Sequence, residues 1–318
     1  MDLKNVNLIG NVGAGTMGHA TALQFAMHGY PVNLFDQDSA SLDRGIVTIQ
    51  HDLATFDRAG LLAEEPATIL ERIHPTTDLQ TAFAHADFII ESITEDLDVK
   101  RTVWQAIEQV IHPNTIMATN TSGLDPTALQ SGLAHPERFV VAHFWNPAQL
   151  MPLVEVVPGQ ATDTATVDLT VHLMNHIGKH AVPLKKASLG FVGNRIQLAV
   201  LREALHIVDQ GIATPEAVDD IIKYSLGRRW SLVGPIASAD LGGLDVFTNI
   251  SGYLYQDLAN DTGTDPVLQA KVQAGELGLK SGHGFYNWTG AAGQQLVAQR
   301  DADLLALLKA DHDTENPS

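Results

Sequence analysis

The chain has 318 residues, of which 45% are hydrophobic and 18% are charged; this is the composition of a globular protein long enough for two domains. Its formal net charge of -18 argues against binding to DNA or RNA, and its lack of cysteine excludes disulfides, thiolate metal sites and a cysteine nucleophile. The sequence has neither an apolar run of membrane-spanning length nor a signal-peptide pattern, so we expect a cytoplasmic protein with no membrane partner and no bound metal.

In the first part of the chain, short apolar runs alternate with helical patterns, which predicts a parallel sheet flanked by helices. The predicted strands are residues 6–12, 32–35, 88–90, 116–118, 139–142, 153–157 and 181–183. The predicted helices are residues 18–28, two within 39–75 (the second around 66–73), 99–110, 125–129 and 164–177. This alternation is typical of a Rossmann-type, doubly wound α/β domain.

Beyond about residue 187 the pattern is helical only, so we predict a sheet domain over 1–186 and an all-α domain over 187–318. The expected helices are residues 191–210, 215–225, 236–260, 266–274 and 294–310, and residues 311–318 read as a disordered polar tail. The first of these helices carries an apolar stripe made of Leu198, Leu201, Leu205 and Val208. That stripe predicts either the core of the helical domain or the interface of a homodimer.

A glycine-rich turn, Gly13-Ala14-Gly15-Thr16-Met17-Gly18, follows the first predicted strand and opens the next helix. In such a GxGxxG turn, backbone N–H groups approach a pyrophosphate, which rests on the helix N-terminus. The turn therefore predicts cofactor contacts from Gly13, Gly15, Thr16, Met17 and Gly18.

Asp36 ends the second predicted strand. Its carboxylate can accept hydrogen bonds from the adenosine ribose and would repel a 2′-phosphate, which favours NAD over NADP. The alternative to a cofactor site is a purely structural glycine turn followed by an unrelated surface aspartate. The sequence also leaves open whether the first strand ends at Ile9 or at Val12, and the earlier end would lengthen the loop by three residues.

His143 follows the predicted strand 139–142, and Glu155 lies within the next predicted strand. A hydrogen-bonded pair of this kind suits alcohol oxidation: the carboxylate fixes the imidazole tautomer, and the imidazole takes the hydroxyl proton while a hydride leaves carbon. A carboxylate in the apolar run 153–157 is costly to bury without a partner. Judged by their spacing alone, His143 and Glu155 could equally be two separate structural residues that do not contact each other.

The segment HFWNPAQLMPLVE, residues 143–155, closely resembles the catalytic signature of the L-3-hydroxyacyl-CoA dehydrogenase family, HFFNP followed by LVEV. Further segments resemble that family in the same order over residues 5–288. They are the glycine loop, Glu91 to Glu95 with Lys100, Asn120-Thr121-Ser122, Gly190 to Arg195, Gly234-Pro235 with Asp240-Leu241, and Lys280 to Tyr286.

The resemblance implies NAD-dependent interconversion of a 3-hydroxyacyl-CoA and a 3-oxoacyl-CoA by a homodimer joined through its helical domain. It implies that His143 is the acid/base, that Glu155 is its partner, and that Ser122 and Asn194 hydrogen-bond the substrate oxygen. It further implies that the nicotinamide end of the cofactor site is lined by Glu95, Lys100, Ser122 and Asn146. The alternatives are a helix-capping role for Ser122 and a turn or capping role for Asn194.

The sequence departs from the family where the CoA phosphates usually pass. The family usually carries several lysines there, but residues 40–66 hold no lysine and only two arginines, Arg44 and Arg58, beside Asp43, Asp52, Asp57, Glu64 and Glu65. Farther on, Arg228 and Arg229 can hold a free carboxylate, and Trp230 can line a pocket or face a cation; a basic surface turn is the alternative.

Three hypotheses therefore stand. The first is an acyl-CoA dehydrogenase, and the second is a dehydrogenase of a free 3-hydroxy acid such as carnitine or gulonate. The third is a catalytically retired structural relative, comparable to a lens crystallin. The intact set of Ser122, His143, Glu155 and Asn194 speaks against the third.

Overall fold

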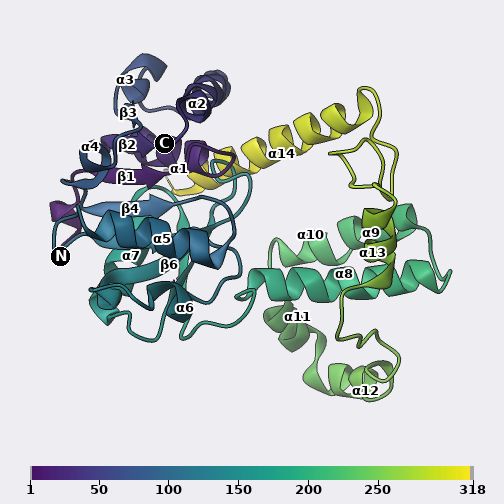
Figure 1. Cartoon of the computed structure of the whole chain (residues 1–318). Helices are drawn as coiled ribbons and strands as arrows, with labels where there is room; N and C mark the ends of the chain where they lie inside the picture. The colour runs from purple at the N-terminus through teal and green to yellow at the C-terminus, as the bar shows by residue number, and fades with distance from the viewer. Residues whose placement is uncertain (1, 316–318) are drawn as a thin grey trace. The chain divides into compact units, whose positions relative to one another are not determined.

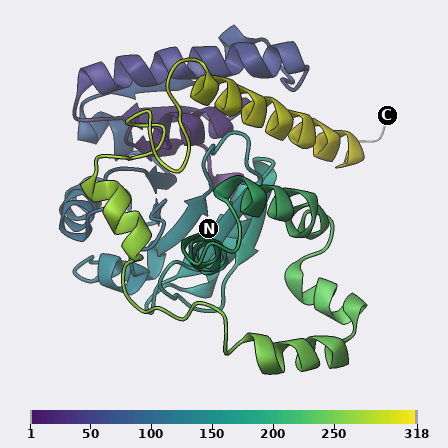
Figure 2. The same cartoon turned by 90° about the vertical axis from the view of Figure 1, so that its right-hand side faces the viewer.

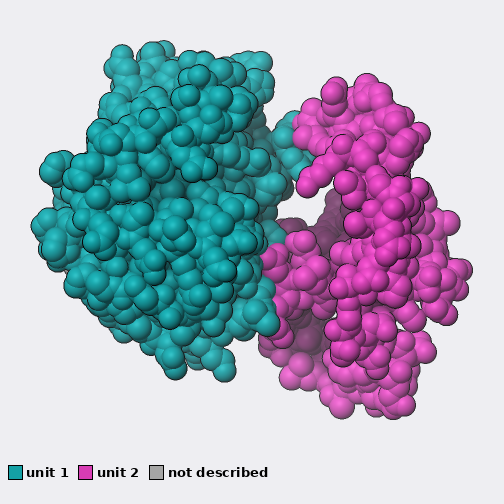
Figure 3. Space-filling model, in the orientation of Figure 1, with its two compact units in different colours: residues 1–192, 300–318 teal, residues 193–299 magenta. Residues whose placement is uncertain are grey.

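The computed structural model describes residues 2–315 and divides into two compact units (Figure 3). Unit 1 comprises residues 1–192 and 300–318, and unit 2 comprises residues 193–299. Unit 1 therefore includes the end of the chain as well as its first part. The domain boundary that the sequence predicts before Ala187 stays a prediction.

Unit 1 is built on an eight-stranded sheet with the order β3-β2-β1-β4-β5-β6-β7-β8 (Figures 1 and 2). The strands are β1 (Ile9–Val12), β2 (Val32–Phe35), β3 (Ile73–Thr76), β4 (Phe88–Glu91), β5 (Ile116–Thr119), β6 (Phe139–Phe144), β7 (Leu153–Pro158) and β8 (His180–Pro183). The first six pair in parallel; β7 pairs antiparallel with β6, and β8 pairs parallel with β7. This order of the first six strands is that of the doubly wound fold, which confirms the predicted fold class.

Helices cover both faces of the sheet, each over its own apolar cluster. The helices of unit 1 are α1 (Gly18–Met27), α2 (Ser39–Ala59), α3 (Pro66–Leu70), α4 (Leu79–Phe83), α5 (Leu97–Glu108), α6 (Pro126–Gln130) and α7 (Thr164–His176). One cluster packs α1, α2 and α7 onto the sheet around Phe25 and Leu173. The other packs α4, α5 and α6 around Phe83 and Trp104. Truncation of a buried aromatic such as Trp104 to alanine typically costs about 3–5 kcal/mol.

The observed elements correct the sequence predictions in unit 1, where the short helix α4 was not predicted. Residues 73–76 form the edge strand β3, where a helix was expected; this strand has only four residues, with Pro75 among them, and it shows no alternation. Strand β1 begins at Ile9 instead of residue 6 and ends at Val12, so the glycine loop has its ordinary length. Strand β6 continues to Phe144, so His143 lies within the strand.

Unit 2 is all-helical, as predicted. Its helices are α8 (Gly193–Asp209), α9 (Pro215–Tyr224), α10 (Leu226–Trp230), α11 (Pro235–Gly242), α12 (Leu244–Leu254), α13 (Pro266–Gln273) and the first part of α14 (Ala292–Glu315). The single helix expected over 236–260 is in fact two, because Gly243 has a positive φ of 90° that a helix does not accommodate. The short helix α10 was not predicted.

The end of helix α14 belongs to unit 1, where the Lys309 ammonium donates to the Ala59 carbonyl over 2.9 Å. Helix α14 continues to Glu315, so the disorder predicted for residues 311–315 is wrong, and residues 316–318 lie outside the described part of the chain. Within residues 2–315, the helices are all too short or too polar to cross a membrane.

Candidate active site

The glycine loop has the geometry of a phosphate-binding turn. A Cβ on Gly13, whose φ is 94°, would lie 2.7 Å from the Ser92 carbonyl oxygen, and a Cβ on Gly18 would lie 1.9 Å from the Gly13 carbonyl oxygen. A Cβ on Gly15, by contrast, would meet no atom within 4 Å. The helix that follows begins after Met17, which contributes no side-chain cap. Open space at the second glycine and an uncapped helix N-terminus fit a bound pyrophosphate.

Asp36 follows β2 and is tied to the loop. Its Oδ2 accepts the Ala14 N–H over 3.0 Å, and its Oδ1 accepts the Asp38 N–H over 3.1 Å. The carboxylate is half-buried and is held at the carboxyl end of β2, beside the glycine loop. This is where a dinucleotide fold binds the adenosine ribose.

A buried ion pair lies next to the loop, at the end of β4. The Lys100 ammonium donates to Glu91 Oε1 over 2.5 Å, and both side chains are essentially inaccessible to solvent. Glu91 also accepts from the Ile93 N–H and the Thr119 hydroxyl, each at 2.7 Å. Taking two charges out of water costs several kcal/mol each, and this geometry offsets the cost with hydrogen bonds to both carboxylate oxygens.

The Glu95 carboxylate accepts hydrogen bonds from the segment that carries Ser122. Its Oε1 accepts from the Thr121 hydroxyl at 2.6 Å and from the Ser122 N–H at 2.9 Å, and the Ser122 hydroxyl lies 3.2 Å away. Burial opposes ionisation of Glu95, but the hydrogen bonds from Thr121 and the charge of Lys100 outweigh it and hold its pKa below the usual range. Lys100 lies 3.6 Å from Glu95 Oε2. Glu95 is therefore a fixed carboxylate that connects the buried pair with the exposed Ser122.

His143 and Glu155 form a hydrogen-bonded pair. The two residues lie opposite each other in the antiparallel β6–β7 ladder, so their side chains point to the same face of the sheet. His143 Nδ1 lies 2.9 Å from Glu155 Oε2, and the residues are 5% and 2% exposed. Glu155 Oε1 accepts the Val192 N–H over 3.0 Å. Because a carboxylate oxygen can only accept, this contact is a hydrogen bond when Nδ1 carries the proton, and Nε2 is then the ring nitrogen outside the pair.

Two aromatic side chains flank the imidazole. The ring of Trp145 lies 5.6 Å from that of His143, and the ring of Phe191 lies 5.5 Å from it. Phe191 is buried, and its backbone is left-handed at a φ of 48°, a conformation that costs about 1–2 kcal/mol in a residue with a side chain. In this conformation the Phe191 ring meets the His143 ring in an edge contact, and the N–H of the next residue, Val192, donates to Glu155 Oε1.

The connection between β6 and β7 carries Asn146, which is exposed. The later part of this connection is held by Lys179, whose ammonium donates to the Ala148 carbonyl at 2.7 Å and the Met151 carbonyl at 3.1 Å. Lys179 is 5% exposed, and burial lowers the pKa of its ammonium to about 7.

The remaining predicted residues belong to unit 2. Asn194 is half-buried in the first turn of α8. Arg228, Arg229 and Trp230 are the last three residues of α10; both arginines are exposed and the tryptophan is half-buried.

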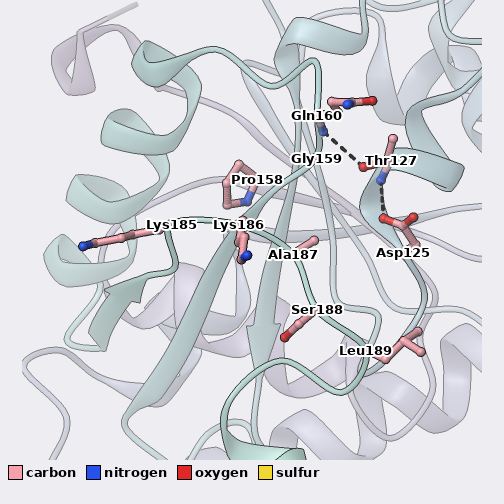
Figure 4. A pocket seen from close by; sticks show the side chains of 10 residues that line it. All are labelled: Asp125, Thr127, Pro158, Gly159, Gln160, Lys185, Lys186, Ala187, Ser188 and Leu189. Carbon is pink, nitrogen blue, oxygen red and sulfur yellow. Dashed lines mark hydrogen bonds between the residues drawn. The ribbon is translucent and has the colours of Figure 1, made fainter.

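A pocket of about 590 Å³ opens within unit 1 between the start of α6, the end of β7 and the segment after β8 (Figure 4). Its polar lining includes Thr127, whose hydroxyl accepts the Gln160 N–H over 3.2 Å, together with the exposed Lys185 and Lys186. These groups would suit an anion, with Asp125 as a competing negative charge on the rim. Over the described side chains, no cluster of three potential metal ligands was found.

Sequence reasoning gave no role to the groups that hold these residues in place, although most of them lie in its motifs. Glu91, Thr119 and Thr121 anchor Glu95 and Lys100, and Val192 anchors Glu155. A usable signal existed at Glu91, since it is a charged residue at the end of an apolar strand run and therefore needed a buried partner.

A glycine-loop sheet unit with a buried His–Glu pair and a following helical unit define a class of nicotinamide-dependent dehydrogenases. The model of the 3-hydroxyacyl-CoA dehydrogenase NAD-binding domain matches residues 8–187, and that of the 3-hydroxyacyl-CoA dehydrogenase C-terminal domain matches residues 190–288. The chain belongs to the 3-hydroxyacyl-CoA dehydrogenase family, as its motifs indicated, and is an NAD-dependent oxidoreductase.

The relatives of the chain differ in their substrates. A probable 3-hydroxybutyryl-CoA dehydrogenase of Deinococcus radiodurans is 40% identical over 281 residues, which cover 88% of this chain and 99% of that one. The 5-formyl-3-hydroxy-2-methylpyridine 4-carboxylate 5-dehydrogenase of Mesorhizobium japonicum is 33% identical over 305 residues, covering 96% and 97%. A solved structure of a dehydrogenase of that second name, described as an NAD+-dependent dismutase, matches with a TM-score of 0.89 at 33% identity, covering 95% of this chain and 97% of that one.

Proposed function

We propose that this protein interconverts an L-3-hydroxyacyl-CoA and a 3-oxoacyl-CoA, with His143 as the acid/base. The observation that carries the proposal is the buried contact between His143 Nδ1 and Glu155 Oε2. It lies in the sheet whose strand β1 leads into the glycine loop. A buried imidazole held by a buried carboxylate is an arrangement suited to proton transfer at a reacting oxygen.

We assign NAD to the glycine loop, with its pyrophosphate at Gly13, Gly15, Thr16, Met17 and Gly18 and its adenosine ribose at Asp36. The exposed Glu95, Ser122 and Asn146 would line the nicotinamide end, and the buried Lys100 acts on that end through Glu95. When bound, NAD supplies the acceptor or donor of the hydride.

The protein's own residues would manage the proton. In alcohol oxidation, His143 takes the hydroxyl proton on Nε2 while Glu155 accepts the hydrogen bond from Nδ1 and stabilises the resulting imidazolium. In the reverse direction the same imidazolium returns the proton. Ser122 and Asn194 would donate hydrogen bonds to the substrate oxygen, where negative charge develops.

A second substrate class, a free hydroxy acid, is favoured by specific observations. Helix α2 carries no lysine and only two arginines, Arg44 and Arg58, and both hydrogen-bond within or next to their own helix. The pyridine-carboxylate relative also covers more of the chain than the hydroxybutyryl-CoA relative does. In this alternative, Arg228 and Arg229 would bind the substrate carboxylate and Trp230 would line its pocket.

The deciding experiment is NADH oxidation by the purified protein with acetoacetyl-CoA, free acetoacetate and 3-dehydrocarnitine, side by side. Turnover of the thioester alone supports the first proposal. Turnover of a free acid that is lost in Arg228→Ala or Arg229→Ala, but retained in the matched exposed variant Arg300→Ala, supports the second. The absence of turnover with every substrate, in a protein that binds NADH, contradicts both.

We further propose that the protein is a homodimer joined through its helical unit. Among the described large apolar side chains of unit 2, Leu205 alone is buried, and many others are widely exposed. The most exposed are Leu232 (84%), Ile236 (79%) and Leu241 (78%). Apolar surface of this extent over several helices fits a second protein surface, and a second copy of the same chain is the simplest one. Sedimentation of the purified protein at the mass of two chains is the expected result, and a monomer across the micromolar range would refute the proposal.

A further inference from the structure

Asn11 is a fully buried amide in the middle of the sheet, and no step of the proposed reaction uses it. It lies in β1, a central strand, and is 0% exposed. Its Nδ2 donates to the Gly13 carbonyl at 3.0 Å and the Gly18 carbonyl at 3.1 Å, and its Oδ1 accepts from the Thr21 hydroxyl at 2.7 Å. An unpaired buried amide is expensive, so this set of partners holds the side chain in a single orientation.

The amide closes the glycine loop from inside. Its two acceptors are the carbonyls of the first and last glycines of the turn, and Gly18 packs so closely on the Gly13 carbonyl that a Cβ there would overlap the Gly13 oxygen. Both carbonyls are thereby turned into the protein. Since the C=O and N–H of a trans peptide point in opposite directions, the N–H groups that follow these carbonyls are turned the other way.

One of those N–H groups reaches the ribose carboxylate. The Gly13 carbonyl is bound by Asn11, and the N–H of the same peptide, which belongs to Ala14, donates to Asp36 Oδ2 at 3.0 Å. Asn11 and Asp36 thus hold the two ends of one peptide plane. Rotation of that plane would misplace both the loop and the carboxylate.

We propose that Asn11 is a positioning residue for NAD: through the Gly13–Ala14 peptide it sets the phosphate loop and the Asp36 carboxylate, and so sets both the affinity for NAD and its selection over NADP. This inference rests on the proposed binding of NAD at the glycine loop. Asn11 would act on the cofactor indirectly, through the backbone of the glycine loop. Its replacement should therefore weaken cofactor binding and leave the rate of the chemical step unchanged.

The test compares Asn11→Leu with Asn33→Leu. Asn33 of β2 is the control, because its amide also donates to two backbone carbonyls, but those belong to Thr81 and Ala82 of α4 and not to the glycine loop. NADH affinity by fluorescence titration, KM and kcat are measured for both variants and the wild type. Loss of a buried amide's hydrogen bonds predicts about tenfold weaker NADH binding in Asn11→Leu, with kcat at saturating cofactor within about twofold of the wild type.

A double-mutant cycle with Asp36→Ala tests the connection through the peptide. Asp36→Ala alone should weaken NAD binding and reduce the preference for NAD over NADP. Adding Asn11→Leu should then cost less than it does in the wild type, because the carboxylate it helps to position is already gone. Independent effects in the cycle would overturn the relay from Asn11 to Asp36.

The outcomes separate this inference from the proposed function. If the wild type fails to bind NADH, the seat of NAD itself is wrong. If the wild type binds NADH but Asn11→Leu and Asn33→Leu bind it equally well, Asn11 has no positioning role. Should Asn11→Leu fail to fold, Thr21→Val, which removes the donor to Oδ1, decides: about threefold weaker NADH binding supports the inference, and unchanged binding overturns it.

Discussion

Unit 1 buries polar side chains, whereas unit 2 exposes apolar ones. In unit 1 the pairs Glu91–Lys100 and His143–Glu155 lie out of water with their hydrogen bonds made, and in unit 2 side chains such as Leu232 and Ile236 face solvent. A buried pair needs only its own unit to be complete, but an exposed apolar surface needs another surface. From this comparison we expect the proton-transfer pair of the proposed reaction to lie in the sheet unit, and the helical unit to contribute Asn194 and an apolar surface for contact with a second chain.

The strongest test of that comparison is His143→Ala. If the sheet unit holds the acid/base, turnover should fall about a thousandfold or more, within the range that general acid–base catalysis contributes, while NADH affinity stays unchanged. Steady-state rates with the active substrate from the panel and NADH fluorescence titration measure both. Near-normal turnover would remove His143 from the mechanism, and exposed His180→Ala serves as the control.

Breaking the buried ion pair gives the next largest effect. Lys100→Met leaves the Glu91 carboxylate buried with only the Ile93 N–H and the Thr119 hydroxyl, so the free energy of unfolding should drop by about 3–5 kcal/mol. Denaturant unfolding gives the value. The exposed pair Lys223–Asp220 is the matched control, since Lys223→Met should change stability by less than about 1 kcal/mol. Equal losses in the two variants would contradict the contrast between buried and exposed pairs.

Lys179 extends the comparison to a buried lysine whose ammonium donates to two backbone carbonyls, those of Ala148 and Met151. Burial lowers its pKa from 10.5 to about 7, so between those pH values the unfolded chain binds more protons than the folded one. The free energy of unfolding attributable to Lys179 should therefore rise as pH increases from about 7, by at most about 1.4 kcal/mol per pH unit, and stay lowest below that window.

Denaturant unfolding at pH 7, 8 and 9 measures this dependence. Lys179→Met should show a shallower rise than the wild type, because the titrating group is absent. Parallel pH profiles for the two proteins would mean that Lys179 stays protonated in the fold.

The smallest expected effect concerns unit 2. A single polar change at its exposed apolar surface, such as Leu241→Ser, should weaken self-association about tenfold, which is typical of losing one well-packed interface residue. Sedimentation over a concentration series gives the dissociation constant. An exposed polar residue of the same unit, changed in Gln256→Ser, supplies the control. Unchanged association in Leu241→Ser would place the contact surface on other residues.

The sheet unit could be predicted in outline from the sequence because its glycine loop and apolar runs have strong local patterns. The edge strand β3 could not, because a four-residue strand with Pro75 lacks any periodicity. The break between α11 and α12 depends on one backbone angle at Gly243, and glycine is also tolerated inside helices.

For the candidate site, the motifs located His143, Glu155 and Asp36, whereas the groups that orient them come from distant segments. Glu155, for example, is held by the Val192 N–H, which only the left-handed Phe191 brings within reach. Asn11 carried a readable signal, an amide in an apolar strand, but its partners depend on how the loop folds back.

The antiparallel β6–β7 ladder has a consequence for how relatives of this protein can diverge in length. His143 and Glu155 meet because they are register partners, and side chains alternate between the two faces of a strand. Deleting one residue between the turn and either member of the pair would turn that side chain to the opposite face of the sheet. A change of length inside the turn, residues 145–152, keeps the two side chains on one face, but that turn also carries Asn146.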